Sequence, residues 1–194
     1  HTFVATAGAV ALAGATPVLV DVVSPTGLLD VEQLESVVTS RTKAIMPVHL
    51  YDQCADMTRI MSFAKSHNVL VIEDASQAHG AEHRGTAAGA WGDLAAFSFY
   101  PGKNLGAWGE AGAVVTRDQA RAERVRKLRD HGSRRKYEHE YVSGNFRLEE
   151  FQGAVLQEKL PYLADWNTQR QALAALYQKE LDSVSPVTNP VVEE

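Results

Sequence analysis

Length and composition describe an ordinary globular chain of 194 residues, of which 45% are hydrophobic and 22% are charged, enough for one sizeable domain with its own core. The net charge of −5 gives no reason to expect a nucleic-acid partner. The single cysteine, Cys54, excludes a disulfide framework and a cysteine-based zinc site. This cysteine content fits a reducing, cytoplasmic location best.

The first residues resemble neither a membrane span nor a signal peptide. The longest apolar stretch, residues 3–20, is interrupted by Gly8, Gly14 and Pro17, and no basic region precedes it. The chain starts at His1 with residues typical of the middle of a domain, and it finishes in a polar tail. We therefore expect that sequence is missing at both ends.

The first half of the chain alternates between helical and extended patterns. The segment at 69–73 (VLVIE) gives the clearest strand, because it is an uninterrupted apolar run that ends in an acid. The pattern predicts helices at 4–14 (buried), 31–40 and 56–67, and strands at 17–22, 43–49 and 69–73.

The second half begins with two short strands, at 94–99 and 113–116. An amphipathic helix is predicted at 118–130, with Ala122, Val125 and Leu128 on its buried face. From residue 147 to about 181 the pattern is helical again, and Pro161 is expected to break or kink it.

Strands that alternate with helices favour a layered α/β fold with a mainly parallel sheet. Ligands of such sheets bind at the carboxyl ends of the strands. Asp74 follows one predicted strand and Ser98 lies at the end of another, so both are candidates for a ligand site.

The segment from residue 97 to 106 (FSFYPGKNLG) presents one lysine, Lys103, on a Pro-Gly turn after a strand. A phosphate-binding P-loop is excluded, because Phe97 and Asn104 stand where that motif needs glycine and serine or threonine. A lysine in this position could form a Schiff base with a carbonyl group. The commoner alternative is an exposed loop lysine.

Asp74 comes directly after the buried 69–73 strand. Pyridoxal-5′-phosphate (PLP) enzymes need a carboxylate that faces the pyridinium nitrogen of the cofactor, because a protonated ring is a better electron sink. Asp74 is placed for that role. The alternative is that it caps the following turn, as aspartate often does.

Five segments, in order along nearly the whole chain, resemble the DegT/DnrJ/EryC1/StrS family of PLP-dependent sugar aminotransferases. They are HTFVATA at 1–7, TKAIMPVHLY at 42–51, EDASQAHGA at 73–81, SFYPGKNLGA at 98–107, and GNFRL at 144–148 with Gln152. Two parts of the family pattern are absent: an N-terminal phosphate-binding Gly-Thr segment and most of a C-terminal small domain.

The resemblance implies the aspartate-aminotransferase-like fold (fold type I), whose PLP-binding large domain is a three-layer α/β/α structure. Residues 1–160 would form the core of that domain. Residues 161–194 would form a helical connection toward the mostly missing small domain.

The resemblance also implies roles for single residues. Lys103 would bind PLP covalently, Asp74 would pair with the pyridine nitrogen, and Gln77 would contact the ring hydroxyl. Ser98 would hydrogen-bond the phosphate, and Phe3 would stack on the ring.

Three further residues would act across a homodimer with shared active sites. Asn145 would reach the phosphate in the neighbouring subunit, and Lys136 and Tyr137 would lie near the substrate there. Without the resemblance, Phe3 is better explained as a core aromatic residue, and Ser98 and Asn145 as turn residues.

The function implied is transfer of an amino group, from glutamate as donor, to a nucleotide-linked keto-deoxysugar. The form of the lysine loop resembles that of members acting on 3-keto sugars. Lys103, once released from the cofactor, would move the proton as general acid and base. Two alternatives stay open: a nucleotide-sugar dehydratase, although those members carry histidine in place of the lysine, and a non-catalytic sensor or regulator.

Two other features have simpler explanations. Residues 117–136 hold nine Lys or Arg against three acids, which indicates a solvated helix face or, alternatively, a diphosphate site at Arg134, Arg135 or Lys136. Metal binding is not expected, because the histidines lack the usual ligand spacing; these are His79, His83, His131 and His139.

Overall fold

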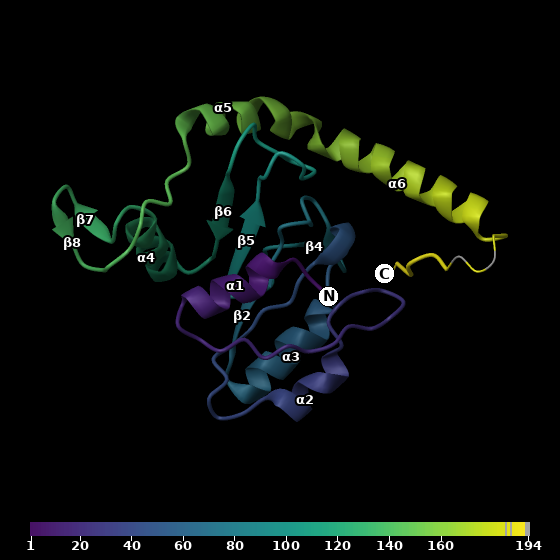
Figure 1. The fold of residues 1–194 in the computed structure, drawn as a ribbon, viewed down its shortest axis with the longest axis horizontal. Coiled ribbons are helices and arrows are strands. Elements are labelled where there is room, and N and C mark those ends of the chain that lie inside the picture. The colour runs from purple at the N-terminus through teal and green to yellow at the C-terminus, as the bar shows by residue number, and fades with distance from the viewer. Residues whose placement is uncertain (185, 187, 193–194) are drawn as a thin grey trace.

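A four-stranded sheet forms the centre of the computed structural model, which describes residues 1–184, 186 and 188–192 (Figure 1). The strand order is β1 (Ala44–Ile45), β2 (Leu70–Asp74), β5 (Leu94–Ser98) and β6 (Gly112–Val115). β1, β2 and β5 are parallel, and β6 runs antiparallel to β5. The mainly parallel α/β sheet predicted from the sequence is confirmed.

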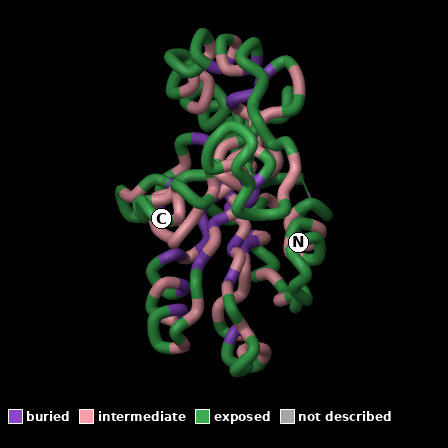
Figure 2. Tube along the Cα trace, turned by 90° about the vertical axis from the view of Figure 1, so that its left-hand side faces the viewer, coloured by how far each residue is buried: buried purple, intermediate pink, exposed green. Residues whose placement is uncertain are grey.

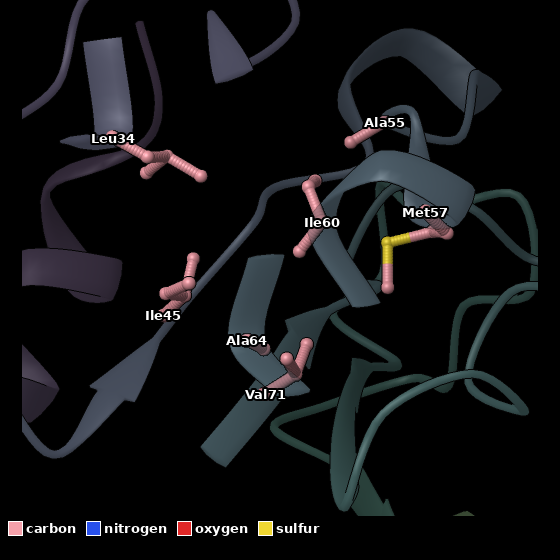
Figure 3. Close-up of a cluster of buried hydrophobic side chains, with 7 residues drawn as sticks. All are labelled: Leu34, Ile45, Ala55, Met57, Ile60, Ala64 and Val71. Atoms are coloured by element: carbon pink, nitrogen blue, oxygen red, sulfur yellow. The ribbon is translucent and has the colours of Figure 1, made fainter. Parts of the chain in front are cut away.

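Helix α3 (Met57–His67) covers part of this sheet. Asp56 caps its first turn by accepting a hydrogen bond from the Arg59 amide at 3.0 Å, and the left-handed residue Asn68 ends it. The buried residues of α3 pack with Val71 of β2 and with Leu34, at the start of α2 (Leu34–Val37), in the cluster of Figure 3. Figure 2 shows short buried stretches inside the molecule, surrounded by intermediate and exposed positions.

Two predictions for the first half of the chain are wrong. Helix α1 (Val4–Leu12) forms, but none of its residues is buried. Residues 17–22 form no strand. Within the described chain, their backbone has one β-type pairing, the isolated bridge between Val22 and Leu29. β-branched residues favour a strand only where a neighbouring strand pairs with them. The helix predicted at 31–40 shortens to the 3₁₀ helix η1 (Val31–Gln33) followed by α2.

The second half follows the prediction more closely. Helix α4 (Gln119–Arg129) leads into the hairpin of β7 (Ser133–Arg135) and β8 (Glu138–His139), and a smaller hairpin joins β3 (Glu82–His83) to β4 (Thr86–Ala87). The predicted apolar face of α4 is only partly covered, so it was wrongly expected to be buried.

The long C-terminal helical segment is broken as predicted. Helix α5 (Glu150–Lys159) and helix α6 (Leu163–Leu181) are joined by the 3₁₀ helix η3 (Leu160–Tyr162), which contains Pro161. In Figure 1 the two helices form an arm that passes the upper end of the sheet. None of the helices in the described chain combines the length and apolar character needed to span a membrane.

Candidate functional site

The candidate site lies at the carboxyl ends of β2 and β5. Asp74 is the last residue of β2 and Ser98 the last of β5. The register pairs Asp74 with Ala96, two residues before Ser98, so the two strand ends are neighbours. Parallel sheets bind ligands at this edge.

The Asp74 side chain is half-buried and accepts two hydrogen bonds from neutral donors. The Thr6 hydroxyl on α1 donates to Oδ2 at 2.7 Å, and the Ser76 amide donates to Oδ1 at 3.1 Å. Within the described residues, no cation forms an ion pair with this carboxylate. A half-buried carboxylate without a counterion is suited to a cationic ligand.

The lysine loop starts directly after β5. The Lys103 amide donates to the Tyr100 carbonyl at 2.9 Å, which closes a turn. A side chain at Gly106 would lie 2.4 Å from the Pro101 carbonyl oxygen, so the loop can close this tightly only with glycine there. The Lys159 ammonium on α5 donates to the Gly106 carbonyl and fixes the far end of the loop.

Lys103 itself is half-buried beside a cleft of about 430 Å³. Its amine has no hydrogen-bond or ion-pair partner in the part of the chain that the structure describes. The cleft is lined by Tyr51, Asp52, Gln77, Gly102, Lys103 and Asn104.

A strained turn forms the opposite wall of the cleft. In the 3₁₀ segment η2 (Leu50–Asp52), Tyr51 and Asp52 both adopt left-handed backbone angles, with φ of 57° and 61°. The turn is held by Gln77, whose side-chain oxygen accepts from the Tyr51 amide at 3.1 Å and whose carbonyl accepts from the Asp52 amide at 2.9 Å.

Burial at the cleft raises the pKa of the Asp52 carboxyl group. The hydrogen bond from Asn104, at 2.5 Å, and the positive charges of Arg170 and Lys103 oppose this effect without cancelling it. Asp52 therefore lies close enough to Lys103 for the two charges to interact.

A buried hydrogen bond between His49 and Glu73 supports the edge of the sheet from inside. The His49 Nε2–H donates to Glu73 Oε2 at 2.9 Å, and both side chains are fully buried. The His49 tautomer is fixed, because Nδ1 accepts from the Ala55 amide. The Glu73 carboxylate also accepts from the amides of Gly89, Trp91 and Gly92 at 2.7–2.9 Å.

His79 holds the end of β5. Its Nε2–H donates to the Ser98 carbonyl at 2.8 Å, and its Nδ1 atom is buried with no partner among the described residues. Burial lowers the pKa of His79, and the positive charge of Lys103 adds to this effect, while the hydrogen bond to Ser98 opposes it. His79 is therefore neutral near pH 7.

The structure brings together only part of the predicted site. Lys103 and Gln77 line one cleft, while Asp74 and Ser98 end the neighbouring strands. Phe3 immediately precedes α1, the helix whose Thr6 hydroxyl bonds to Asp74, but Phe3 is 69% exposed.

The other three predicted residues lie elsewhere. Asn145 pairs with Asp130 at the end of α4. The exposed Lys136 and Tyr137 lie between β7 and β8, with the ammonium 5.2 Å from the ring centroid. Figure 1 shows this hairpin at the opposite side of the molecule from the C-terminal end of α6.

Four residues at the site were not predicted. Asn104 could have been suspected from its place beside Lys103 and Asp52 from its place beside the HLY segment. No pattern in the sequence marks Thr6 or Asn167, whose contacts are made across 68 and 88 residues of chain. Among the described residues, no group of three or more His, Cys, Asp or Glu side chains is arranged to hold a metal ion.

Comparison with known proteins gives one consistent family. The model of the DegT/DnrJ/EryC1/StrS aminotransferase family matches residues 1–194. The erythromycin biosynthesis sensory transduction protein EryC1 of Saccharopolyspora erythraea is 51% identical over 98% of this chain and 52% of its own length. The dTDP-3-amino-3,4,6-trideoxy-alpha-D-glucose transaminase of Streptomyces venezuelae is 49% identical over 98% of this chain and 50% of its own length.

The solved structures agree with this result. The crystal structure of S. venezuelae DesV in complex with a ketimine intermediate superposes with a TM-score of 0.97 at 48% identity, covering 100% of this chain and 52% of DesV. The chain thus spans about half the length of the curated relatives it matches.

Proposed function

Since the chain belongs to the DegT/DnrJ/EryC1/StrS aminotransferase family, we propose that its full-length protein is a PLP-dependent aminotransferase acting on a nucleotide-linked keto-deoxysugar. The observation that carries the proposal is an amine and a carboxylate near the ends of neighbouring strands, one on the loop after β5 and the other at the end of β2. Within the described residues, neither the Lys103 amine nor the Asp74 carboxylate forms a close ion pair, although Lys103 lies near enough to Asp52 for their charges to interact.

These two groups fit PLP. The Asp74 carboxylate suits the protonated ring nitrogen, and the Lys103 amine suits the aldehyde of the cofactor. Gln77 lines the cleft beside Lys103 and is assigned to the ring hydroxyl, and Ser98 is assigned to the phosphate. Phe3, next to the helix that carries Thr6, is assigned to the ring face. When bound, PLP supplies an electron sink that stabilises negative charge on the substrate carbon.

The chain's own residues then have distinct tasks. Lys103 holds the cofactor and, once released, moves the proton at the reacting carbon as general acid and base. Thr6 and the Ser76 amide orient the Asp74 carboxylate, which keeps the ring nitrogen protonated. His79 holds the β5 end, and with it Ser98, through a neutral ring.

The proposed substrate is a 3-keto sugar on a nucleotide, with glutamate as the amino donor. The transaminase of Streptomyces venezuelae, named for a dTDP-linked 3-amino sugar, supports the nucleotide and the ring position. Lys136 and Tyr137 are proposed to contact this substrate, and Asn145 the cofactor phosphate, in the neighbouring subunit of a homodimer. Residues 1–160 would be the core of the large domain, and 161–194 its helical connection to a small domain.

A regulatory function is the second candidate, because one relative is named a sensory transduction protein. A protein that only senses a ligand has no need of a lysine and a carboxylate at these positions. Lys103, Asp74 and Gln77 are all present, which favours the enzyme.

The first half of the reaction tests the proposal. Full-length protein loaded with PLP should convert glutamate to 2-oxoglutarate in an amount equal to the active sites. Asp74→Asn should keep most of the cofactor and slow this conversion roughly a hundredfold or more, because the ring nitrogen loses its carboxylate.

The exposed residue Asp21 provides the matched control, since Asp21→Asn removes a carboxylate away from the cleft. Unchanged conversion by pure Asp74→Asn protein would make Asp74 a turn residue. Cofactor binding with no conversion of glutamate by the wild type would favour the sensor.

A further inference from the structure

The amide side chain of Asn167 on helix α6 forms hydrogen bonds with two segments beside the cleft. Its Nδ2 donates to the His79 carbonyl at 2.6 Å, and its Oδ1 accepts from Asn104 Nδ2 at 3.2 Å. A carbonyl oxygen can only accept, so the amide has one orientation that satisfies both partners. Both ends of the side chain are thus used, each on a different segment.

The two segments carry residues assigned to the cofactor. Asn104 follows Lys103 directly, and His79 comes two residues after Gln77. Asn104 Nδ2 also donates to Asp52 Oδ2, so its two protons join α6 to the strained turn on the other wall of the cleft. One chain of hydrogen bonds therefore links the lysine loop, the Gln77 segment and that turn.

The Asn167 amide packs so closely against the backbone after His79 that a side chain at Gly80 would clash with it. Gly80 adopts a φ of +90°, and a Cβ atom there would lie 2.9 Å from Asn167 Nδ2. The helix thus packs directly on the backbone of the Gln77–Gly80 segment. None of the residues of α6 is buried in the described chain, so the helix brings little apolar packing to this contact.

We propose that Asn167 is a positioning residue, which holds the Lys103 loop and the Gln77 segment in the relative placement that the reaction needs. It acts through Asn104 and the His79 carbonyl and touches no reacting atom. The role rests on the proposed function and ties the placement of α6 to the geometry of the cleft.

Two substitutions separate the two halves of this contact. Asn167→Ala removes both hydrogen bonds. Asn167→Asp keeps an acceptor for Asn104 but places a second oxygen against the His79 carbonyl, where it repels. The neighbouring Thr168→Ala is the matched control, because among the described residues the Thr168 hydroxyl bonds only within its own helix, to the Ala164 carbonyl at 3.0 Å.

Hydrogen–deuterium exchange on the full-length protein, with and without PLP, gives a readout that needs no activity. Asn167→Ala should speed exchange several-fold in peptides that cover 77–81 and 102–106. Asn167→Asp should do so mainly in 77–81. Exchange no faster than in Thr168→Ala would overturn the proposal.

The glutamate half-reaction gives the second readout. Asn167→Ala should lower its rate constant about tenfold with little change in the unfolding temperature, since small misplacements of reacting groups slow catalysis strongly. In a double-mutant cycle, Asn104→Ala added to Asn167→Ala should cost less than the sum of the two changes.

A lower unfolding temperature with an unchanged rate constant for the folded protein would show a merely structural role and overturn the proposal. A wild type that lacks the half-reaction would reject the proposed function instead. The exchange pattern would in that case still decide whether Asn167 holds the two segments.

Discussion

Glu73 and Asp74 are adjacent on β2, yet their carboxylates meet different surroundings. The Glu73 side chain is fully buried and accepts four hydrogen bonds, one from His49 and three from backbone amides. Asp74 is half-buried and accepts two. The alternation of side chains along a strand therefore gives one carboxylate to the core and the other to the ligand edge.

The environment of Glu73 makes the stability of the fold depend on pH. Burial alone would raise the pKa of Glu73, but the hydrogen bonds from His49, Gly92 and Gly89 outweigh it and hold the pKa below the ordinary value of 4.5. A lowered pKa means that the contribution of Glu73 is complete above that value and is lost as the pH falls below it.

Glu73→Gln should destabilise the protein by about 2–4 kcal/mol at pH 7, because the amide cannot accept hydrogen bonds at both ends and leaves buried donors unpaired. The difference in unfolding free energy between wild type and variant should shrink as the pH falls below 4.5. Urea unfolding at several pH values measures it. Glu35→Gln, at an exposed position, is the control. An equal effect of the two substitutions on the unfolding free energy would refute the stabilising role of Glu73.

At the scale of elements, the lysine loop depends on one close backbone approach. A Cβ at Gly106 would lie 2.4 Å from the Pro101 carbonyl oxygen and 2.9 Å from that of Tyr100. Neither oxygen belongs to a flexible side chain, so the loop itself must shift to admit a methyl group.

Gly106→Ala should therefore lower the free energy of unfolding by about 1–3 kcal/mol. Gly102→Ala is the matched control in the same loop, because its Cβ would meet only the Tyr100 ring, at an ordinary 3.6 Å. Chemical denaturation of both variants checks the difference. Equal stability of the two proteins would mean that the loop adapts freely.

The elements also show how far the sequence alone could lead. Helix α3 and strand β2 were predicted closely, because a capped amphipathic helix and an apolar run are local signals. Residues 17–22 have the composition of a strand but pair in the described chain only through the isolated bridge of Val22 to Leu29, and strand pairing is a tertiary property.

The same division holds for the site. Lys103, Asp74, Gln77 and Ser98 could be proposed from motifs that lie at strand ends. The contacts of Thr6 and Asn167 depend on how distant segments come together, and no local pattern encodes them.

At the scale of the whole molecule, several proposed residues lie far from the cleft of their own chain. Asn145, Lys136 and Tyr137 belong to the region around the β7–β8 hairpin. They could complete an active site only in a second copy. Large apolar side chains of α5 and its surroundings are exposed in the single chain and available for such packing, among them Trp108 and Phe151.

A homodimer with shared sites should show complementation. Lys103→Ala and Asn145→Ala proteins, each impaired alone, should regain some activity when mixed under conditions of subunit exchange, because one site of the mixed dimer then has both residues intact. Activity no higher than the sum of the separate proteins, after proven exchange, would argue against shared sites. Sedimentation of the protein as a monomer at the assay concentration would rule out the homodimer.

Chemical trapping tests whether Lys103 holds the cofactor. Full-length protein with PLP should be yellow, and borohydride reduction should fix the cofactor to the peptide that contains Lys103. Lys103→Ala protein should give no fixed cofactor. Label on another lysine, such as Lys43 or Lys65, or no label on a protein that binds PLP, would show that Lys103 does not hold the cofactor.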